Sequence, residues 1–304
     1  MEYCIETHGI SKKYRNFQAL DGISMHIPKG SIYGFVGKNG AGKTTLIRIL
    51  CGMQEPSAGN FLLFGTNNTD KNFTKVKQRI GAVVESPAIY MDITAKQNLM
   101  LQYKVLGLPS YDGIDELLHL VGLEEAGSKK VRNFSLGMKQ RLGIAISLCG
   151  SPDFLILDEP TNGLDPQGII EMRELILKLN RERQITVLIS SHILDELSKL
   201  ATYYGFIDRG RMLMELSAKE LEKECSKSQR VKVSNIKAFC KAMDERNIPY
   251  SILSDTQADI FGEISVTELV TALLAEDCTV FSVETRDESL ENYYMNLVGG
   301  RHYE

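Results

Sequence analysis

Short apolar runs alternate with longer stretches of helical spacing along much of this chain. Residues 31–36, 154–157 and 185–189 are mostly apolar, which is typical of strands that are buried on both faces. Apolar residues at helical spacing follow the first two of these runs, over 44–50 and 167–183. Strands that alternate with helices in this way predict a parallel sheet with helices on its faces.

Two regions depart from this alternation. Residues 1–36 alternate in the manner of β-strands, so we expect a β-rich start of the chain. Apolar residues at helical spacing dominate from about 94 to 148. The sequence therefore predicts that residues 86–150 form a mainly helical insertion between strands of the sheet.

The character of the sequence changes after about residue 214. Ser217 and Glu220 form a capping-box pattern, which predicts the start of a short charged helix. Beyond it the expected elements follow in the order β-α-β-β-α-β, the ferredoxin-like arrangement, with one more helix at the end. We therefore predict an α/β domain over 1–225 and an accessory α+β domain over 226–304. The second domain shows no catalytic motif, so its expected role is structural or in binding a partner.

A glycine-rich stretch joins the first buried strand to its helix. It reads Gly37-Lys38-Asn39-Gly40-Ala41-Gly42-Lys43-Thr44-Thr45 and matches the phosphate-binding pattern G-x-x-x-x-G-K-[ST]. Glycines let successive backbone N–H groups curl around a phosphate, and the helix N-terminus adds partial positive charge. Lys43 is expected to reach the β- and γ-phosphates, and the Thr44 hydroxyl to ligate Mg²⁺. The stretch therefore predicts a binding site for a nucleoside triphosphate.

The second buried strand ends in two acids, Asp158 and Glu159. Ligands of a parallel sheet collect beyond the carboxyl ends of its strands, so both carboxylates are expected near the phosphates. Asp158 suits the Mg²⁺ shell, because a hard cation prefers oxygen ligands. Glu159 suits a general base that polarises the attacking water. Together with Lys43, these residues predict that the triphosphate is hydrolysed.

Composition limits the compartment and the partners. The chain has 304 residues, of which 43% are hydrophobic and 24% charged, and a net charge of −4 that disfavours nucleic acid as a partner. Its six cysteines lack C-x-x-C spacing, which predicts buried thiols in a reducing compartment. Neither a secretory signal nor an apolar run of about 18 residues is visible. We expect a cytoplasmic protein that reaches a membrane only through a partner.

A further motif indicates the family. Ser135-Leu136-Gly137-Met138-Lys139-Gln140-Arg141 resembles the signature motif of ATP-binding cassette (ABC) ATPases, whose usual form is L-S-G-G-Q. Leu136 replaces the first glycine of that motif, whereas Ser135 and Gly137 are kept. These two are the positions that approach the γ-phosphate in the family, so the resemblance implies the same role here.

Other motifs of the same family occur in their usual order over about residues 1–215. The D-loop position is occupied by Asp165, and His192, after the third buried strand, resembles the switch histidine. Tyr14 resembles the aromatic residue that stacks on adenine, a role for which Phe17 competes. Alone each residue has an ordinary structural explanation, and the order of the motifs is what favours the family.

The resemblance implies both a fold and a mechanism. The fold is an α/β ATPase domain with a mixed sheet core and a helical subdomain. Two cassettes pair head to tail, so that each ATP, with its Mg²⁺, lies between the phosphate loop of one chain and Ser135 and Gly137 of the other. One cassette per chain implies a homodimer, the simplest closed assembly, which drives an integral membrane permease. The short spacing from Lys43 to Ser135 excludes the long coiled coils of ABC proteins that act on chromosomes.

One position departs from the common pattern of the family. Most ABC ATPases have a glutamine where this chain has Glu85. The glutamate, its Glu-Ser-Pro context and the small C-terminal domain resemble the bacitracin-resistance and lantibiotic-immunity exporters. We expect Glu85 to join Thr44 and Asp158 as a Mg²⁺ ligand. We also expect its charge to make the empty site more self-repulsive, because Asp158 and Glu159 lie close by.

Three other functions stay open beside an antimicrobial-peptide exporter. A generic drug or polymer exporter has the same architecture, with Glu85 as chance drift. A soluble ABC ATPase that acts on DNA or ribosomes requires a basic face or long insertions, which charge and spacing disfavour. A regulatory nucleotide-binding module without turnover is disfavoured because Glu159 and His192 are both present.

Overall fold

The computed structural model describes residues 2–224, 228–261, 264–286 and 290–298. The chain divides into two compact units, Met1–Ala218 and Lys219–Glu304. Each unit has its own β-sheet and its own buried apolar cluster. The domain boundary predicted between residues 225 and 226 lies outside the described residues.

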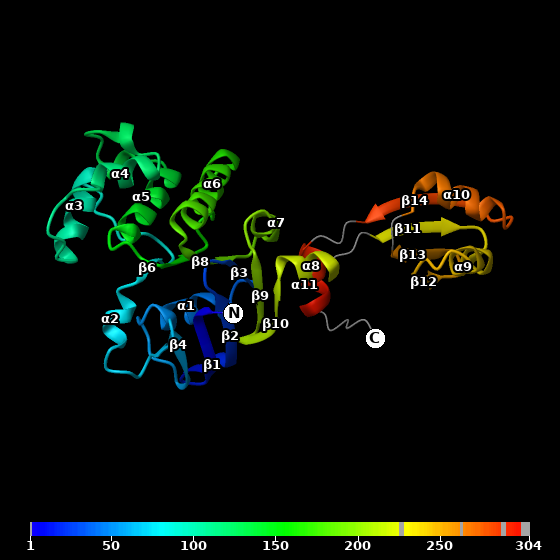
Figure 1. The fold of residues 1–304 in the computed structure, drawn as a ribbon, viewed down its shortest axis with the longest axis horizontal. Helices are drawn as coiled ribbons and strands as arrows, with labels where there is room; N and C mark the ends of the chain where they lie inside the picture. Colours follow the sequence, from blue (N-terminus) through cyan, green and yellow to red (C-terminus); the bar gives the residue numbers. More distant parts are fainter. Residues whose placement is uncertain (1, 225–227, 262–263, 287–289, 299–304) are drawn as a thin grey trace. The chain divides into compact units, whose positions relative to one another are not determined.

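Six strands form the central sheet of the first unit, in the order β10-β9-β3-β8-β7-β6 (Figure 1). Their bounds are β3 Ile32–Val36, β6 Ile80–Val83, β7 Phe154–Asp158, β8 Thr186–Ser191, β9 Tyr203–Asp208 and β10 Arg211–Ser217. Neighbouring strands from β9 to β6 are parallel, whereas β10 pairs with β9 in antiparallel fashion. Every residue of β3, β7 and β8 is buried, as their continuous apolar runs predict.

A second, antiparallel sheet is built mainly from the start of the chain. Its strands lie in the order β2-β1-β4-β5, with the bounds β1 Tyr3–Tyr14, β2 Phe17–Pro28, β4 Ala58–Leu63 and β5 Thr66–Asn67. Helix α1, Lys43–Leu50, adds Leu46 and Ile47 to the buried cluster that also contains Ile23 of β2 and Phe35 of β3. The two sheets therefore share one core with α1.

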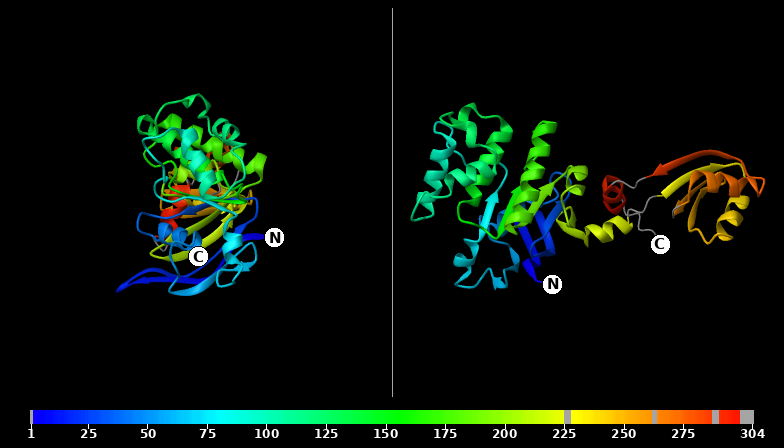
Figure 2. Two further views of the ribbon diagram at one scale, coloured as in Figure 1. Left: turned by 90° about the vertical axis from the view of Figure 1, so that its left-hand side faces the viewer. Right: turned by 45° about the horizontal axis from the view of Figure 1, so that its top comes forward.

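Three helices form a group that follows β6 and precedes β7 along the chain. They are α3 Ala95–Val105, α4 Ile114–Leu120 and α5 Leu136–Leu148, with 3₁₀ turns η1 Glu124–Ala126 and η2 Val131–Asn133 between the last two. Helix α3 begins at a capping box, in which the Thr94 hydroxyl accepts from the Gln97 N–H at 3.2 Å and the Gln97 side chain accepts from the Thr94 N–H at 3.0 Å. Figures 1 and 2 show this group and the antiparallel sheet at opposite ends of the first unit, with the central sheet between them.

The remaining helices of the first unit are α2 Phe73–Lys77, α6 Pro166–Arg183 and α7 Leu194–Ser198. Helix α6 occupies the segment 167–183 for which helical spacing predicts a helix, and it ends at Gln184 in a left-handed conformation with φ 55°. None of the described helices combines the length and apolar character that a membrane span requires.

The second unit contains a four-stranded antiparallel sheet in the order β12-β13-β11-β14. Its elements are α8 Ala218–Glu224, β11 Ser228–Val233, α9 Ile236–Asp244, β12 Tyr250–Ser254, β13 Gln257–Phe261, α10 Val266–Leu274, β14 Val280–Arg286 and α11 Leu290–Val298. Phe239 of α9 and Leu269 of α10 are buried with Val231 and Ile260 of the sheet. Between α8 and α11 the order β-α-β-β-α-β is the expected one, and kinship with ferredoxin-like domains stays a prediction.

The described cysteines are free thiols, namely Cys4, Cys51, Cys149, Cys240 and Cys278. Burial raises the pKa of Cys51 and of Cys149 to about 12, and the Asp158 charge adds to the effect at Cys51. These two thiols stay protonated at neutral pH and pack as small apolar groups. Cys225 lies outside the described residues.

Candidate functional site

The glycine-rich stretch lies at the carboxyl end of β3 and leads directly into α1 (Figure 1). Gly37 and Ala41 are buried, whereas Lys38, Asn39 and Gly40 at the turn of the loop are exposed. The Ala41 N–H donates to the Lys38 carbonyl at 3.0 Å, which closes the loop on itself. The first turn of α1 holds Lys43, Thr44 and Thr45. The sequence predicts this strand–loop–helix arrangement.

Two glycines of the loop are required by their surroundings. A Cβ on Gly37 would lie 2.7 Å from the carbonyl oxygen of Ile207 in β9. Gly42 has φ +111°, and a Cβ there would lie 2.9 Å from the Ala19 carbonyl oxygen of β2. The loop thus packs closely against β9 at Gly37 and against β2 at Gly42, and only glycine fits at these two positions.

Lys43 is 5% exposed and points back into the loop. Its ammonium donates to the Gly37 carbonyl at 2.5 Å and to the Lys38 carbonyl at 3.4 Å. It also lies 3.2 Å from Oε1 of Glu159, an ion pair without hydrogen-bond geometry. The structure therefore joins the lysine of the phosphate loop to the predicted general base.

Asp158 links three elements at the carboxyl edge of the sheet. Its Oδ2 accepts from the Thr44 hydroxyl at 2.9 Å, and its Oδ1 accepts from the Ser190 hydroxyl of β8 at 2.6 Å. The Asp158 side chain is 3% exposed, so these bonds offset the cost of burying its charge. Two hard oxygen donors, from Thr44 and Asp158, lie next to each other, and this donor set fits a Mg²⁺ ion. Sequence reasoning missed Ser190 as a partner of Asp158, although it lies two residues before the predicted His192.

Glu159 is held from both its backbone and its side chain. Its φ of +51° is rare for a residue with a side chain, and its N–H donates to the Ser190 carbonyl at 3.2 Å and hydroxyl at 3.0 Å. Its Oε2 lies 2.7 Å from Nδ1 of His192. The predicted base and the predicted switch histidine are therefore in direct contact.

Glu85 lies two residues beyond the end of β6 and has φ +61°. Its Oε1 accepts from Nη2 of Arg48 on α1 at 2.7 Å, a residue that the sequence did not single out. This pairing adds a positive charge that the expected self-repulsion of the empty site did not include, and the self-repulsion itself stays a prediction. Glu85 is neutralised by Arg48, and Glu159 is in contact with both Lys43 and His192.

Two aromatic residues lie at the tip of the hairpin formed by β1 and β2. Tyr14 and Phe17 are direct cross-strand partners, 40% and 63% exposed. The Tyr14 hydroxyl bonds to the side chain of Gln54, and the Lys12 ammonium lies 5.4 Å from the centre of the Tyr14 ring. Strand β2 continues into Ala19, the neighbour of Gly42, so the aromatic tip lies on the strand that packs against the phosphate loop.

Comparison with known proteins identifies the family of this site. The ABC transporter family matches residues 20–162. The bacitracin transport ATP-binding protein BcrA of Bacillus licheniformis is 40% identical over 303 residues, which cover 99% of each chain. The chain belongs to the family of ABC transporter ATP-binding proteins.

Two further similarities agree with this membership and confirm the predicted resemblance and the α/β cassette fold. The lantibiotic transport ATP-binding protein SrtF of Streptococcus pyogenes is 43% identical over 211 residues, 69% of this chain and 90% of that protein. The structure of cbiO1 from Clostridium perfringens, part of the ABC transporter complex cbiONQ, is 29% identical with a TM-score of 0.66 and covers 74% of this chain and 92% of that one. The chain is thus an ABC ATPase, and its cassette is a nucleotide-binding domain.

The signature residues of this ABC cassette lie at the start of helix α5. Ser135 caps helix α5, and its hydroxyl accepts from the Met138 N–H at 3.2 Å. Gly137 in the first turn faces Leu164, which a Cβ on the glycine would approach to 3.8 Å. Asp165 caps α6, where its side chain accepts from the Gly168 N–H at 3.2 Å. None of the described contacts of these residues reaches the phosphate loop of the same chain.

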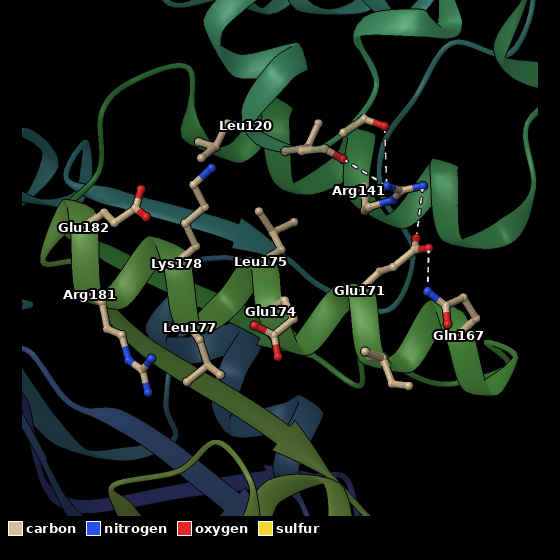
Figure 3. A pocket seen from close by; sticks show the side chains of 13 residues that line it. Leu120, Arg141, Gln167, Glu171, Glu174, Leu175, Leu177, Lys178, Arg181 and Glu182 are labelled. Atoms are coloured by element: carbon tan, nitrogen blue, oxygen red, sulfur yellow. Dashed lines mark hydrogen bonds and ion pairs between the residues drawn. The ribbon is translucent and has the colours of Figure 1, made fainter.

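A cavity of about 600 Å³ lies in a different part of the ABC cassette (Figure 3). It is lined by α5, α6 and the turn after α4, and Arg141 of α5 pairs there with Glu171 of α6 at 3.5 Å. Gln167 donates to the same glutamate at 3.3 Å. No predicted site residue lines this cavity, so it is separate from the predicted nucleotide site.

Proposed function

We propose that this chain is the ATP-hydrolysing subunit of an ABC exporter that protects cells from antimicrobial peptides of the bacitracin or lantibiotic type. The observation that carries the catalytic part is the position of Glu159, between the ammonium of Lys43 and the imidazole of His192. The substrate class is supported by relatives named for bacitracin or lantibiotic transport, one of which is 40% identical along 99% of its length.

Binding of ATP replaces contacts that Lys43 makes within its own loop. The ammonium exchanges the carbonyls of Gly37 and Lys38 for the β- and γ-phosphate oxygens, while backbone N–H groups at the N-terminus of α1 donate to the same phosphates. Thr44, Asp158 and Glu85 are the residues that would hold Mg²⁺, which when bound neutralises charge on the β- and γ-phosphates. The adenine stacks on Tyr14, with Phe17 as the competing ring.

Hydrolysis needs a base beside the γ-phosphate. The Glu159 carboxylate takes a proton from the attacking water. The oxygen of that water bonds to the γ-phosphorus as the bond between the γ-phosphorus and ADP breaks. His192 orients that carboxylate through the 2.7 Å contact with Oε2. The products are ADP and phosphate, and their release lets Lys43 return to its loop carbonyls.

The complete site requires two chains. Ser135 and Gly137 begin a helix that makes no described contact with the phosphate loop of its own chain, which supports their pairing with the ATP of a second copy. A two-fold homodimer closes such an assembly with two equivalent sites. Asp165, which comes shortly after Asp158 and Glu159 in the sequence, belongs to the nucleotide site of this dimer. The dimer drives an integral membrane permease from the cytoplasmic side.

Complementation of a deletion strain tests this function. Cells that lack the gene receive the parent chain, Lys43→Ala, Glu159→Gln or the control Glu182→Gln, which changes an exposed residue of α6. We expect the parent and the control to restore tolerance of bacitracin or a lantibiotic, and the two site variants to fail. Equal tolerance in all strains, with a permease that co-purifies and stimulates ATP hydrolysis, would instead favour a generic drug or polymer exporter.

A further inference from the structure

The ion pair between Arg48 and Glu85 lies on the flank of α1 that carries Thr44. Residues four apart share one face of a helix, so the Arg48 side chain leaves α1 one turn beyond the Thr44 hydroxyl. That hydroxyl donates to Asp158 at 2.9 Å, and the Arg48 guanidinium holds Glu85 at 2.7 Å. The guanidinium thus holds the Glu85 carboxylate on the flank of α1 that also carries the Thr44 hydroxyl of the proposed Mg²⁺ site.

The backbone brings Glu85 to the same level of the sheet as the catalytic glutamate. Val83 of β6 and Leu157 of β7 are register partners in neighbouring parallel strands, and each is followed two residues later by a glutamate. Both glutamates, Glu85 and Glu159, have positive φ, +61° and +51°. Two adjacent strands are therefore each followed by a glutamate of positive φ. Glu159 pairs with Lys43, and Glu85 pairs with Arg48.

Two of the three carboxylates at this edge, Glu85 and Glu159, have a cationic partner before any nucleotide is present, whereas Asp158 is bonded to two hydroxyls. Arg48 neutralises Glu85, and both groups keep partial access to water, with side chains 37% and 58% exposed. A divalent cation beside Thr44 and Asp158 attracts the Glu85 carboxylate, because a hard cation favours carboxylate oxygen. The guanidinium and the cation are then rivals for one carboxylate, which cannot bond fully to both.

We propose that Arg48 is a positioning residue that competes with the divalent cation for Glu85 and so sets the Mg²⁺ concentration at which nucleotide binds. The proposal rests on the proposed function, since it requires Mg²⁺ and ATP at Thr44 and Asp158. Before the metal–nucleotide complex binds, Arg48 holds Glu85 and with it the start of the loop after β6. When the complex binds, the carboxylate exchanges the guanidinium for the metal.

The test is binding of the non-hydrolysable analogue β,γ-imido-ATP to the full-length chain, measured by calorimetry at a series of Mg²⁺ concentrations. We expect Arg48→Gln to lower the half-saturating Mg²⁺ concentration by about two- to fivefold, the range that a half-exposed ion pair can supply. Arg48→Lys keeps the positive charge and should behave like the parent. Arg48→Gln added to Glu85→Gln should produce no further shift, because the carboxylate for which the two cations compete is gone.

A matched control is Lys96→Gln, which removes an exposed ion pair of similar geometry, 2.7 Å from Asp115, in the helical group. It should leave the Mg²⁺ dependence of analogue binding unchanged. An unchanged or higher half-saturating concentration for Arg48→Gln, or the same shift in the Glu85→Gln background, overturns the competition. If the parent itself fails to bind the analogue with Mg²⁺, the proposed function fails instead, so the two failures are distinguishable.

Discussion

Replacing Glu159 with glutamine perturbs the centre of the proposed hydrolytic site while leaving its shape almost unchanged. The carboxylate lies 3.2 Å from Lys43 and 2.7 Å from His192, so the substitution removes one negative charge between the Lys43 ammonium and the His192 imidazole. An amide cannot take the proton of the attacking water. A general base contributes about 10²–10⁴-fold, which corresponds to about 3–5 kcal/mol of the activation barrier.

The same substitution should leave ATP binding intact or modestly tighter. In the parent, ATP has to draw the Lys43 ammonium away from Glu159, its anionic partner. In Glu159→Gln that attraction is absent, so the lysine is available to the phosphates at no electrostatic cost from the glutamate. Retained binding without turnover should also keep two chains together around their trapped ATP.

Three measurements check this prediction on the purified full-length chain. Phosphate release gives the rate of hydrolysis, calorimetry gives the affinity for ATP, and light scattering gives the mass with and without ATP. Glu182→Gln, an exposed change of the same chemistry on α6, is the control and should match the parent in all three. Full ATPase activity of Glu159→Gln refutes the assignment of Glu159 as the base, and loss of ATP binding refutes the argument from Lys43.

Three further outcomes follow from the site and the fold. His192→Ala should lower the rate of phosphate release while ATP affinity is kept, and an unchanged rate contradicts its contact with the base as a catalytic one. Tyr14→Ala should weaken ATP binding by about 1–3 kcal/mol if the Tyr14 ring stacks on the adenine. If the Phe17 ring stacks on the adenine instead, Phe17→Ala should lose more affinity for ATP than Tyr14→Ala. Deleting 226–304 should leave ATP binding by residues 1–225 intact, because the second unit has its own core, and a folded truncated chain without ATP binding contradicts this independence.

The sequence predicts the phosphate loop and its acids because their determinants are local. The phosphate site is built from adjacent segments of the chain, namely strand β3, the glycines and the first turn of α1. The local conformation of each segment decides which residue type it requires, as at Gly42 with φ +111°. The acids at the end of β7 follow the same logic, because a buried apolar strand in a parallel sheet must deliver its last residues to one edge.

The pairings that complete the site are not local and could not be predicted in this way. The sequence near Glu85 does not indicate its ion pair with Arg48, which lies on another element. The hydrogen bond from Ser190 to Asp158 depends on the register of β7 and β8. Ser135 and Gly137 were identified through family resemblance alone. Their described contacts are those of an ordinary helix start, and in the proposed homodimer their partner is another chain.

The sheet order of the first unit has a consequence for how the protein is made. Strand β3 lies between β8 and β9, which the ribosome delivers long after the phosphate loop itself. At about 5–20 residues per second, the roughly 170 residues up to the end of β9 take on the order of 10–30 s to translate. Until β8 is complete at residue 191, the apolar strand in front of the loop has neither of its sheet neighbours. A nascent chain released before residue 186 therefore carries the nucleotide motif beside a strand without its sheet neighbours, and unpaired apolar strands favour aggregation.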